Sequence, residues 1–135
     1  MPSADAVLVD THALLWWQAG SVRLSATARR HIDAASRVLV SPVSCWEVAM
    51  LVAKERVRLD RPTTRWVRDL FSADAEVAEL SVDVAVAAAE LADFHGDPAD
   101  RFLWATALRR GVPLVSKDDR MRAYAALHRT ATVVW

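Results

Sequence analysis

The chain has 135 residues, of which 53% are hydrophobic, so it can bury the core of one domain and is not a disordered chain. Lysine and arginine together number 17, as do aspartate and glutamate, so the net charge at neutral pH is zero. This balance excludes a polybasic protein that binds nucleic acid through a global positive field. The one cysteine, Cys45, excludes an internal disulfide and a cysteine-rich zinc site.

The beginning of the chain carries no targeting signal that we recognise. Residues 1–10 lack a basic segment followed by an apolar one, so we expect no signal peptide. No apolar run approaches the roughly 18 residues that a membrane helix needs. We therefore expect a cytoplasmic protein.

The hydrophobic pattern predicts strands and helices that alternate along the chain. The predicted strands are residues 6–9, 38–40, 77–80, 112–115 and 132–134. The predicted helices are residues 11–19, 25–35, 42–55, 63–71, 82–94, 98–110 and 120–127, with a polar connector at 56–62. Short apolar strands between helices predict a parallel sheet with helices on both faces, in a single domain of residues 1–135.

Four acidic residues are expected at one edge of this sheet. Asp10 follows the first predicted strand, Asp118 follows the fourth, and Asp100 lies in the first turn of the helix that Asp97 caps. Glu47 lies near the start of the helix that follows the second strand. Binding sites of open parallel sheets lie at the carboxyl ends of the strands, so we expect the four acids to converge there.

Glu47 is the most informative of the four, because it is the only charged residue between Pro42 and Ala53. A helix that is apolar all round is predicted to be buried, and a buried carboxylate needs a metal ion or an arginine as its partner. We favour the metal ion. Trp46 on the same helix is expected in the core.

The other tryptophans add to the expected core. We expect Trp104 to be buried. Trp16 and Trp17 are adjacent on one predicted helix, so they cannot point the same way. We expect one of them in the core and the other on an exposed apolar patch.

The remaining acids also have purely structural explanations. Asp10 and Asp118 could cap the helices that follow them, with Asp119 competing for the second role, and Asp100 could interact favourably with a helix dipole. A cluster of carboxylates stays ionised only when a cation neutralises it, and oxygen ligands favour Mg²⁺ or Mn²⁺ over zinc. The histidines show no metal-binding spacing, so we expect His12 and His95 to be polar residues at the rim.

Four segments carry a family resemblance: D-T-H-A-L-L-W-W (10–17), S-P-V-S-C-W-E-V-A (41–49), D-P-A-D-R-F-L-W-A-T-A (97–107) and L-V-S-K-D (114–118). In this order they resemble the PIN-domain nucleases, and among these the VapC-type toxins of toxin–antitoxin pairs. The resemblance implies a three-layer α/β/α fold with a five-stranded parallel sheet flanked by helices. It also implies an Mg²⁺- or Mn²⁺-dependent endoribonuclease site at Asp10, Glu47, Asp100 and Asp118, with Thr11 and Ser116 as supporting polar residues.

The same resemblance implies the partners of the protein. They are an RNA substrate, a second copy of the chain in a homodimer, and a cognate VapB-type antitoxin. The C-terminal segment of the antitoxin is expected in a groove near the first helices and the Glu47 helix.

Basic residues beside the fourth acid are expected to contact RNA. Lys117, Arg120 and Arg122 lie next to Asp118 and could form a local basic rim although the net charge is zero. Arg101 follows Asp100 directly, but helix geometry turns it away from that neighbour.

Two other functions remain open. One is an α/β phosphatase or phosphoacceptor domain with Asp10 as nucleophile. This class needs no glutamate buried in a helix, and the chain lacks a second acid two residues after Asp10. The other is a non-catalytic module whose acidic pocket binds an arginine of a partner protein.

Overall fold

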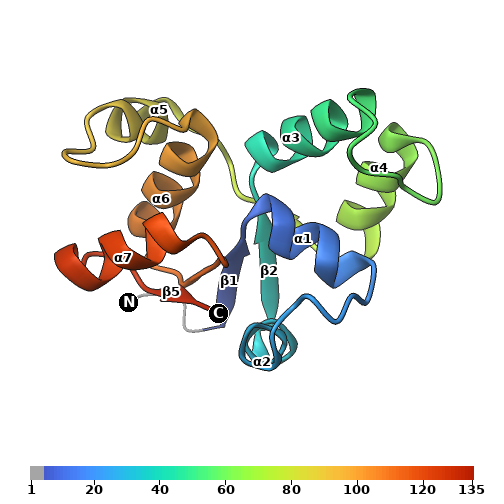
Figure 1. Cartoon of the computed structure of the whole chain (residues 1–135), viewed down its shortest axis with the longest axis horizontal. Helices are drawn as coiled ribbons and strands as arrows, with labels where there is room; N and C mark the ends of the chain where they lie inside the picture. The colour runs from blue at the N-terminus through green and yellow to red at the C-terminus, as the bar shows by residue number, and fades with distance from the viewer. Residues whose placement is uncertain (1–4) are drawn as a thin grey trace.

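A five-stranded parallel sheet forms the centre of the protein (Figure 1). The computed structural model describes residues 5–135, so the expectation of no signal peptide in residues 1–10 falls partly outside the described residues. The strands are β1 (Ala6–Val9), β2 (Arg37–Val40), β3 (Glu76–Val77), β4 (Leu114–Val115) and β5 (Val133–Val134). They lie in the order β3-β2-β1-β4-β5, and every neighbouring pair is parallel.

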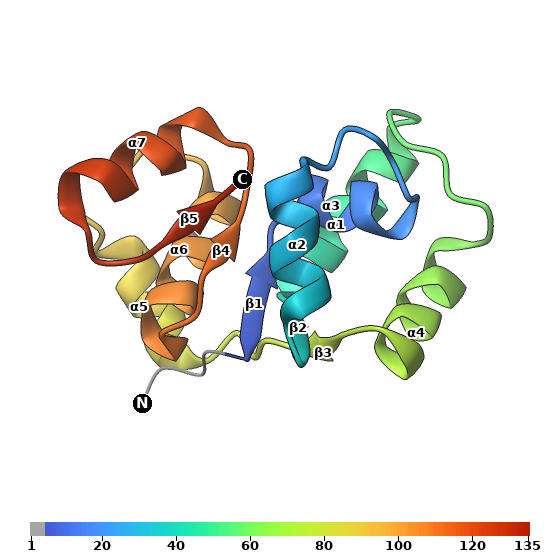
Figure 2. The same ribbon diagram turned by 90° about the horizontal axis from the view of Figure 1, so that it is seen from below.

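Helices cover both faces of the sheet, as Figures 1 and 2 show. Along β1, Val7 and Val9 belong to one core cluster while Ala6 and Leu8 belong to the other, as the two-residue period of a strand requires. The first cluster is covered by α1 (Thr11–Gln18), α2 (Ala26–Ala34), α3 (Pro42–Ala53) and α4 (Thr63–Ala73). The second is covered by α6 (Pro98–Arg110) and α7 (Asp119–His128), and α5 (Val82–Ala89) packs against α6. The predicted three-layer α/β/α fold is therefore confirmed.

Helix boundaries agree with the sequence where capping is strong. Ser25 caps α2 by accepting the N–H of Ala28, and Ser41 caps α3 by accepting the N–H of Val43. Gly111 ends α6 in the left-handed conformation, with φ of 63°, which glycine adopts without steric cost.

The predicted helix 82–94 is too long. Helix α5 ends at Ala89, and Asp93 takes a positive φ of 60° as the chain turns back. The turn lets Phe94 enter the core, where its ring lies 5.7 Å from the ring of Trp104 and 4.9 Å from that of Tyr124. Burial of an aromatic side chain outweighs the helix propensity of the alanine-rich segment.

The third and fourth strands are shorter than predicted. Residues 77–80 were expected to form a strand, but β3 is Glu76–Val77, because the register of pairing stops where β2 ends at Val40. Leu80 packs instead against the cluster between α5 and α6. Strand β4 begins at Leu114, one residue after Pro113, which has no N–H to donate to a ladder.

Helix α3 is not buried all round as the sequence indicated. Only Ser44 and Val48 are buried along it, and Trp46 is 59% exposed, so the prediction of a core position for Trp46 is wrong. The packing of α3 against α1, α4 and α6 covers one stripe of the helix and leaves apolar side chains outside. Trp104 is fully buried as expected, while Trp16 and Trp17 are both partly buried.

None of the helices within residues 5–135 has the length and apolar character needed to cross a membrane.

The turn after α1 gives a test of local strain. Gly20 has φ of +62°, whereas Gly96 lies outside the positive-φ region, and an added Cβ would meet nothing within 4 Å at either position. Gly20→Ala should therefore lower the free energy of unfolding by about 1 kcal/mol, through backbone conformation alone. Urea unfolding measures the change. The control Gly96→Ala should change it by less than about 0.5 kcal/mol, and equal losses in the two variants would contradict the strain argument.

Candidate functional site

A cavity of about 580 Å³ opens beside the carboxyl ends of β1 and β4. The four predicted acids all line it, although they come from four separate segments of the chain. The lining residues are Asp10, Thr11, His12, Trp16, Arg23, Glu47, Asp97, Asp100, Leu103, Lys117, Asp118, Asp119 and Arg120. The structure therefore brings together residues that are up to 110 positions apart, from Asp10 to Arg120.

Asp10 is the most deeply buried of the four acids, at 7% exposed. It is the N-cap of α1, where its Oδ1 accepts the N–H of Ala13 at 2.8 Å. Burial raises the pKa of Asp10 to about 6, against the lowering effect of hydrogen bonds from Ser116 and Ala13. Asp10 therefore both caps α1 and lines the cavity.

Ser116 contacts both Asp10 and Asp118. Its side chain is fully buried and hydrogen-bonds to Asp10, and its Oγ accepts the N–H of Asp118 at 3.0 Å. The predicted supporting residue thus fixes Asp10 and Asp118 relative to each other.

Glu47 is partly buried and faces the cavity from α3. The hydroxyl of Thr11 donates a short hydrogen bond to Glu47 Oε1, and the Oγ of Ser44 lies 3.1 Å from Thr11 Oγ1. Burial raises the pKa of Glu47, and the negative charges of Asp97 and Asp100 raise it further. Within residues 5–135, no lysine or arginine forms a salt bridge with Glu47, so the structure does not contain the arginine partner considered from the sequence.

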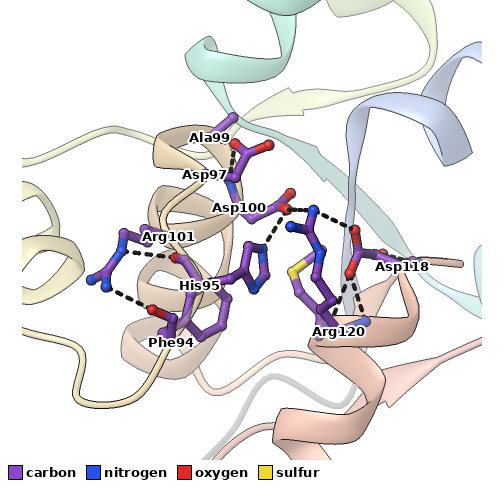
Figure 3. Close-up of polar contacts among 10 residues, drawn as sticks. Phe94, His95, Asp97, Ala99, Asp100, Arg101, Asp118 and Arg120 are labelled. Carbon is purple, nitrogen blue, oxygen red and sulfur yellow. Dashed lines mark hydrogen bonds and ion pairs between the residues drawn. The ribbon is translucent and has the colours of Figure 1, made fainter.

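Asp100 and Asp118 come together with a histidine that the sequence analysis placed at the rim. His95 Nε2 lies 2.7 Å from Asp100 Oδ2, and both side chains are 15% exposed (Figure 3). Donor atoms of His95, Asp100 and Asp118 all lie within 4.8 Å of one another. The spacing between histidines does not reveal that His95 lies beside Asp100. A usable signal is its position two residues before Asp97, the cap of α6, which places it close to the start of that helix.

Burial also raises the pKa of Asp100. The hydrogen bond with His95 lowers it, while the charges of Asp97 and Asp118 raise it. Asp97, the N-cap of α6, accepts the N–H groups of Ala99 and Asp100, as predicted, and also lines the cavity. Its effect on two neighbouring acids was not anticipated.

Asp118 and Asp119 have different surroundings. Asp118 caps α7 through Oδ1, which accepts the N–H groups of Arg120 and Met121 at 2.9 and 3.0 Å. Its side chain is 25% exposed. The side chain of Asp119 is 96% exposed and pairs with Arg122 at 3.6 Å. This geometry favours Asp118 as the fourth acid of the site.

Two of the three predicted basic contacts lie at the cavity. Arg120 Nη2 is 3.7 Å from Asp100 Oδ2 and 3.6 Å from Asp118 Oδ2, and Lys117 Nζ lies 5.7 Å from the centre of the Trp16 ring. Arg122 is not among the lining residues. The Arg120 side chain is 60% exposed, so its ion pairs contribute little, about 0–1 kcal/mol each, and leave the cluster with excess negative charge.

The donor set fits a hard divalent cation. Desolvation raises the pKa of Asp10, Glu47 and Asp100, which means that their negative charges are poorly compensated within the described part of the chain. Carboxylate oxygens are the ligands that Mg²⁺ and Mn²⁺ prefer.

Comparison with known proteins identifies the family. The PIN domain family model matches residues 7–127. The chain belongs to the PIN domain family. Ribonuclease VapC22 of Mycobacterium tuberculosis (strain ATCC 25618 / H37Rv) is 37% identical to this PIN domain over 129 residues, which cover 96% of the chain and 98% of the relative. The resemblance to VapC-type PIN proteins is therefore confirmed.

Solved structures share the fold of this PIN domain. VapBC2 from Rickettsia felis, crystallised with a promoter DNA fragment, matches with a TM-score of 0.67 at 12% identity, over 95% of this chain and 96% of that one. FitAcB from Neisseria gonorrhoeae matches with a TM-score of 0.51 at 13% identity, over 94% and 95% of the two chains. At these identities the likeness is one of fold.

The buried acid at the cavity floor gives a pH-dependent prediction for the metal-free protein. The pKa of Asp10 is 3.8 ordinarily and about 6 in the folded chain, so the folded state favours the protonated form. Asp10 therefore costs no stability below about pH 4. Its destabilising effect grows as the pH rises from about 4 to about 6, where the unfolded chain loses the proton and the folded chain keeps it, and is constant at higher pH. Asn cannot ionise and caps helices as well as Asp does. Asp10→Asn should raise the free energy of unfolding at pH 7 by about 2 to 3 kcal/mol.

Urea unfolding in the presence of a chelator, at pH values from 4 to 7, measures this effect. The parent and Asp10→Asn should converge near pH 4. The exposed Asp33→Asn on α2 is the control, and its difference from the parent should be much smaller at pH 7. A difference for Asp10→Asn that is the same at every pH would contradict the assignment to Asp10 ionisation.

Proposed function

We propose that this PIN domain is an Mg²⁺- or Mn²⁺-dependent endoribonuclease and the toxin of a VapBC-type toxin–antitoxin pair. The observation that carries the proposal is the convergence of Asp10, Glu47, Asp100 and Asp118 on one cavity. Among the described residues the only cationic side chain paired with them by a lysine or arginine salt bridge is the exposed Arg120, which reaches Asp100 and Asp118 but neither Asp10 nor Glu47. The similarity to Ribonuclease VapC22 over nearly the whole chain supports RNA as the substrate. We expect this activity in the cytoplasm.

Each acid has a defined part in this proposal. Asp10, Glu47 and Asp100 would hold the principal cation, and Asp118 would complete its shell or help to hold a second one. A bound divalent cation would supply activation of water and stabilisation of the charge that develops on the phosphodiester. Thr11 and Ser116 orient the carboxylates of Glu47 and Asp10, and their hydrogen bonds favour the ionised forms.

The rim of the cavity supports RNA binding through local contacts. Lys117 and Arg120 lie beside the acids and are exposed, so they are available to phosphate groups on either side of the bond that is cut. The predicted contact from Arg122 has weaker support, because Arg122 does not line the cavity and its guanidinium pairs with Asp119. The chain has no net charge, so RNA affinity should depend on this rim and on the bound cation.

A neighbouring groove supports the antitoxin as partner. A second cavity of about 720 Å³ shares His12, Trp16 and Arg23 with the acidic one. It runs along α1, the end of α3 and the connector 56–62, with apolar and arginine side chains in its lining. A segment of a VapB-type antitoxin laid along it would reach the acidic cavity. The homodimer remains a prediction from the resemblance.

The alternative of a phosphoacceptor domain has less support. A nucleophilic Asp10 would have to present a carboxylate oxygen to a phosphorus atom, but this side chain is 7% exposed and is hydrogen-bonded to Ala13 and Ser116. The alternative of a non-catalytic module that binds a partner's arginine also has less support. Such a pocket needs exposed carboxylates, and it does not need the deeply buried Asp10.

Cleavage of RNA by the purified chain tests the proposal. The parent should cleave RNA with Mg²⁺ or Mn²⁺ and not with chelator. Asp10→Asn and Glu47→Gln should each lower the rate by more than about 100-fold, because loss of a residue that only supports a metal ligand already costs 10- to 100-fold. Glu90→Gln, at the exposed end of α5, is the matched control and should retain full activity. Absence of cleavage with either metal would overturn the ribonuclease proposal.

Two adjacent acids provide a second, internally controlled test. Asp118→Asn and Asp119→Asn make the same chemical change one residue apart, and Asn preserves the capping bonds at position 118. Asp118→Asn should lower the rate of RNA cleavage by about 10-fold or more, while Asp119→Asn should stay within about twofold of the parent. The reverse order would assign the fourth acid to Asp119.

A further inference from the structure

The segment between α5 and α6, residues 90–97, has no regular secondary structure but carries a residue of the site. Among the described residues, no backbone N–H donates to the carbonyls of residues 91–96, and a segment of this kind needs other donors to hold one conformation. Tyr124 supplies one such donor, because its hydroxyl donates to the carbonyl of Ala92 at 2.7 Å.

Arg101 on α6 supplies most of the others. Its Nη1 donates to the carbonyl of Ala88 at 2.8 Å and approaches that of Leu91 at 3.4 Å. Its Nη2 donates to the carbonyl of Phe94 at 2.9 Å, and its Nε donates to the carbonyl of His95 at 3.1 Å. All three nitrogens of one guanidinium therefore bind the end of α5 and the segment that follows. Figure 3 shows the bonds to Phe94 and His95.

These bonds determine where the His95 side chain lies. Its ring stacks on that of Phe94, with 4.4 Å between ring centres and 23° between planes, and Phe94 is anchored in the core. The backbone carbonyl of His95 is held by Arg101, while the Nε2 of the ring lies 2.7 Å from Asp100 Oδ2. Arg101 and Asp100 are neighbours in sequence and point in different directions, yet they are joined through His95.

We propose that Arg101 and His95 are positioning residues for Asp100: Arg101 fixes the segment that carries His95, and the Nε2–H of His95 donates to Asp100 Oδ2 and orients this carboxylate toward the cavity. Both the imidazolium and the neutral Nε2–H tautomer can donate this bond. Hydrogen-bonded partners of metal ligands act in this way, and their loss typically weakens metal binding about 10- to 100-fold. The inference rests on the proposed function, because it assigns Asp100 to cation binding.

Binding of Mn²⁺ to the metal-free protein, followed by electron paramagnetic resonance of the free ion, tests the proposal without any RNA. His95→Ala should raise the Mn²⁺ dissociation constant about 10- to 100-fold, and Arg101→Met should raise it in the same direction. The double variant should be no weaker than His95→Ala alone, because Arg101 acts through His95. Arg101→Lys, which keeps the charge but loses the fork of donors, should fall between the parent and Arg101→Met.

His95→Gln separates positioning from direct metal ligation. The amide nitrogen of Gln can take the place of the imidazole Nε2 and still donate to Asp100, but it does not ligate Mn²⁺ as imidazole does. We expect His95→Gln to recover most of the affinity that His95→Ala loses. Failure of His95→Gln to recover any affinity would overturn the positioning role of His95.

Arg109→Met is the control for Arg101→Met. Arg109 lies on the same helix and pairs with Asp83 at an exposed position, so this variant should bind Mn²⁺ like the parent. Arg101→Met that lowers the melting temperature but leaves Mn²⁺ affinity within twofold of the parent would show a merely structural role and overturn the inference. Independent, multiplicative effects of Arg101→Met and His95→Ala would also overturn it. A parent protein that binds no Mn²⁺ would overturn both this inference and the metal site of the proposed function.

Discussion

The position of Asp10 at the end of the central strand is the constraint on which the site depends. Strand β1 pairs with β2 on one side and β4 on the other, so segments that leave all three strands meet around this residue. The backbone N–H of Asp10 donates to the carbonyl of Val115, which brings Ser116 against the Asp10 carboxylate. On the other side Thr11 reaches Glu47 from the first turn of α1. The buried carboxylate is costly, and its raised pKa records that cost.

Helix capping and the acidic site use the same side chains. Asp10, Asp97 and Asp118 are the N-caps of α1, α6 and α7, and all three line the cavity. Oδ1 of Asp118 accepts backbone N–H groups, while its Oδ2 lies 3.6 Å from Nη2 of Arg120. The positive ends of three helix dipoles therefore point at the cluster and offset part of its repulsion. The structural and the functional explanations of these aspartates, which are alternatives in the sequence, are compatible in the fold.

Much of the fold was predictable from local chemistry. The β-branched runs located β1 and β2, and the caps Ser25, Ser41 and Asp97 located the starts of three helices. Helix α5 was predicted too long, because its alanine-rich sequence does not reveal that Phe94 is drawn into the core. The exposure of Trp46 was missed for a related reason: an apolar helix is expected to be buried, but the number of neighbours that cover it depends on the packing of distant elements.

The sequence by itself determined the element order and the helix caps, because each depends on residues a few positions apart. The four acids were predicted with the help of the family resemblance, and their role stays a prediction. The tertiary structure decided the place of His95, which stacks on Phe94 and meets Asp100 only after the segment 90–97 folds back. It also separated Arg120, which faces the acids, from Arg122, which pairs with Asp119. Burial, aromatic stacking and hydrogen bonds to backbone carbonyls act between segments once they pack, so residue spacing alone does not encode them.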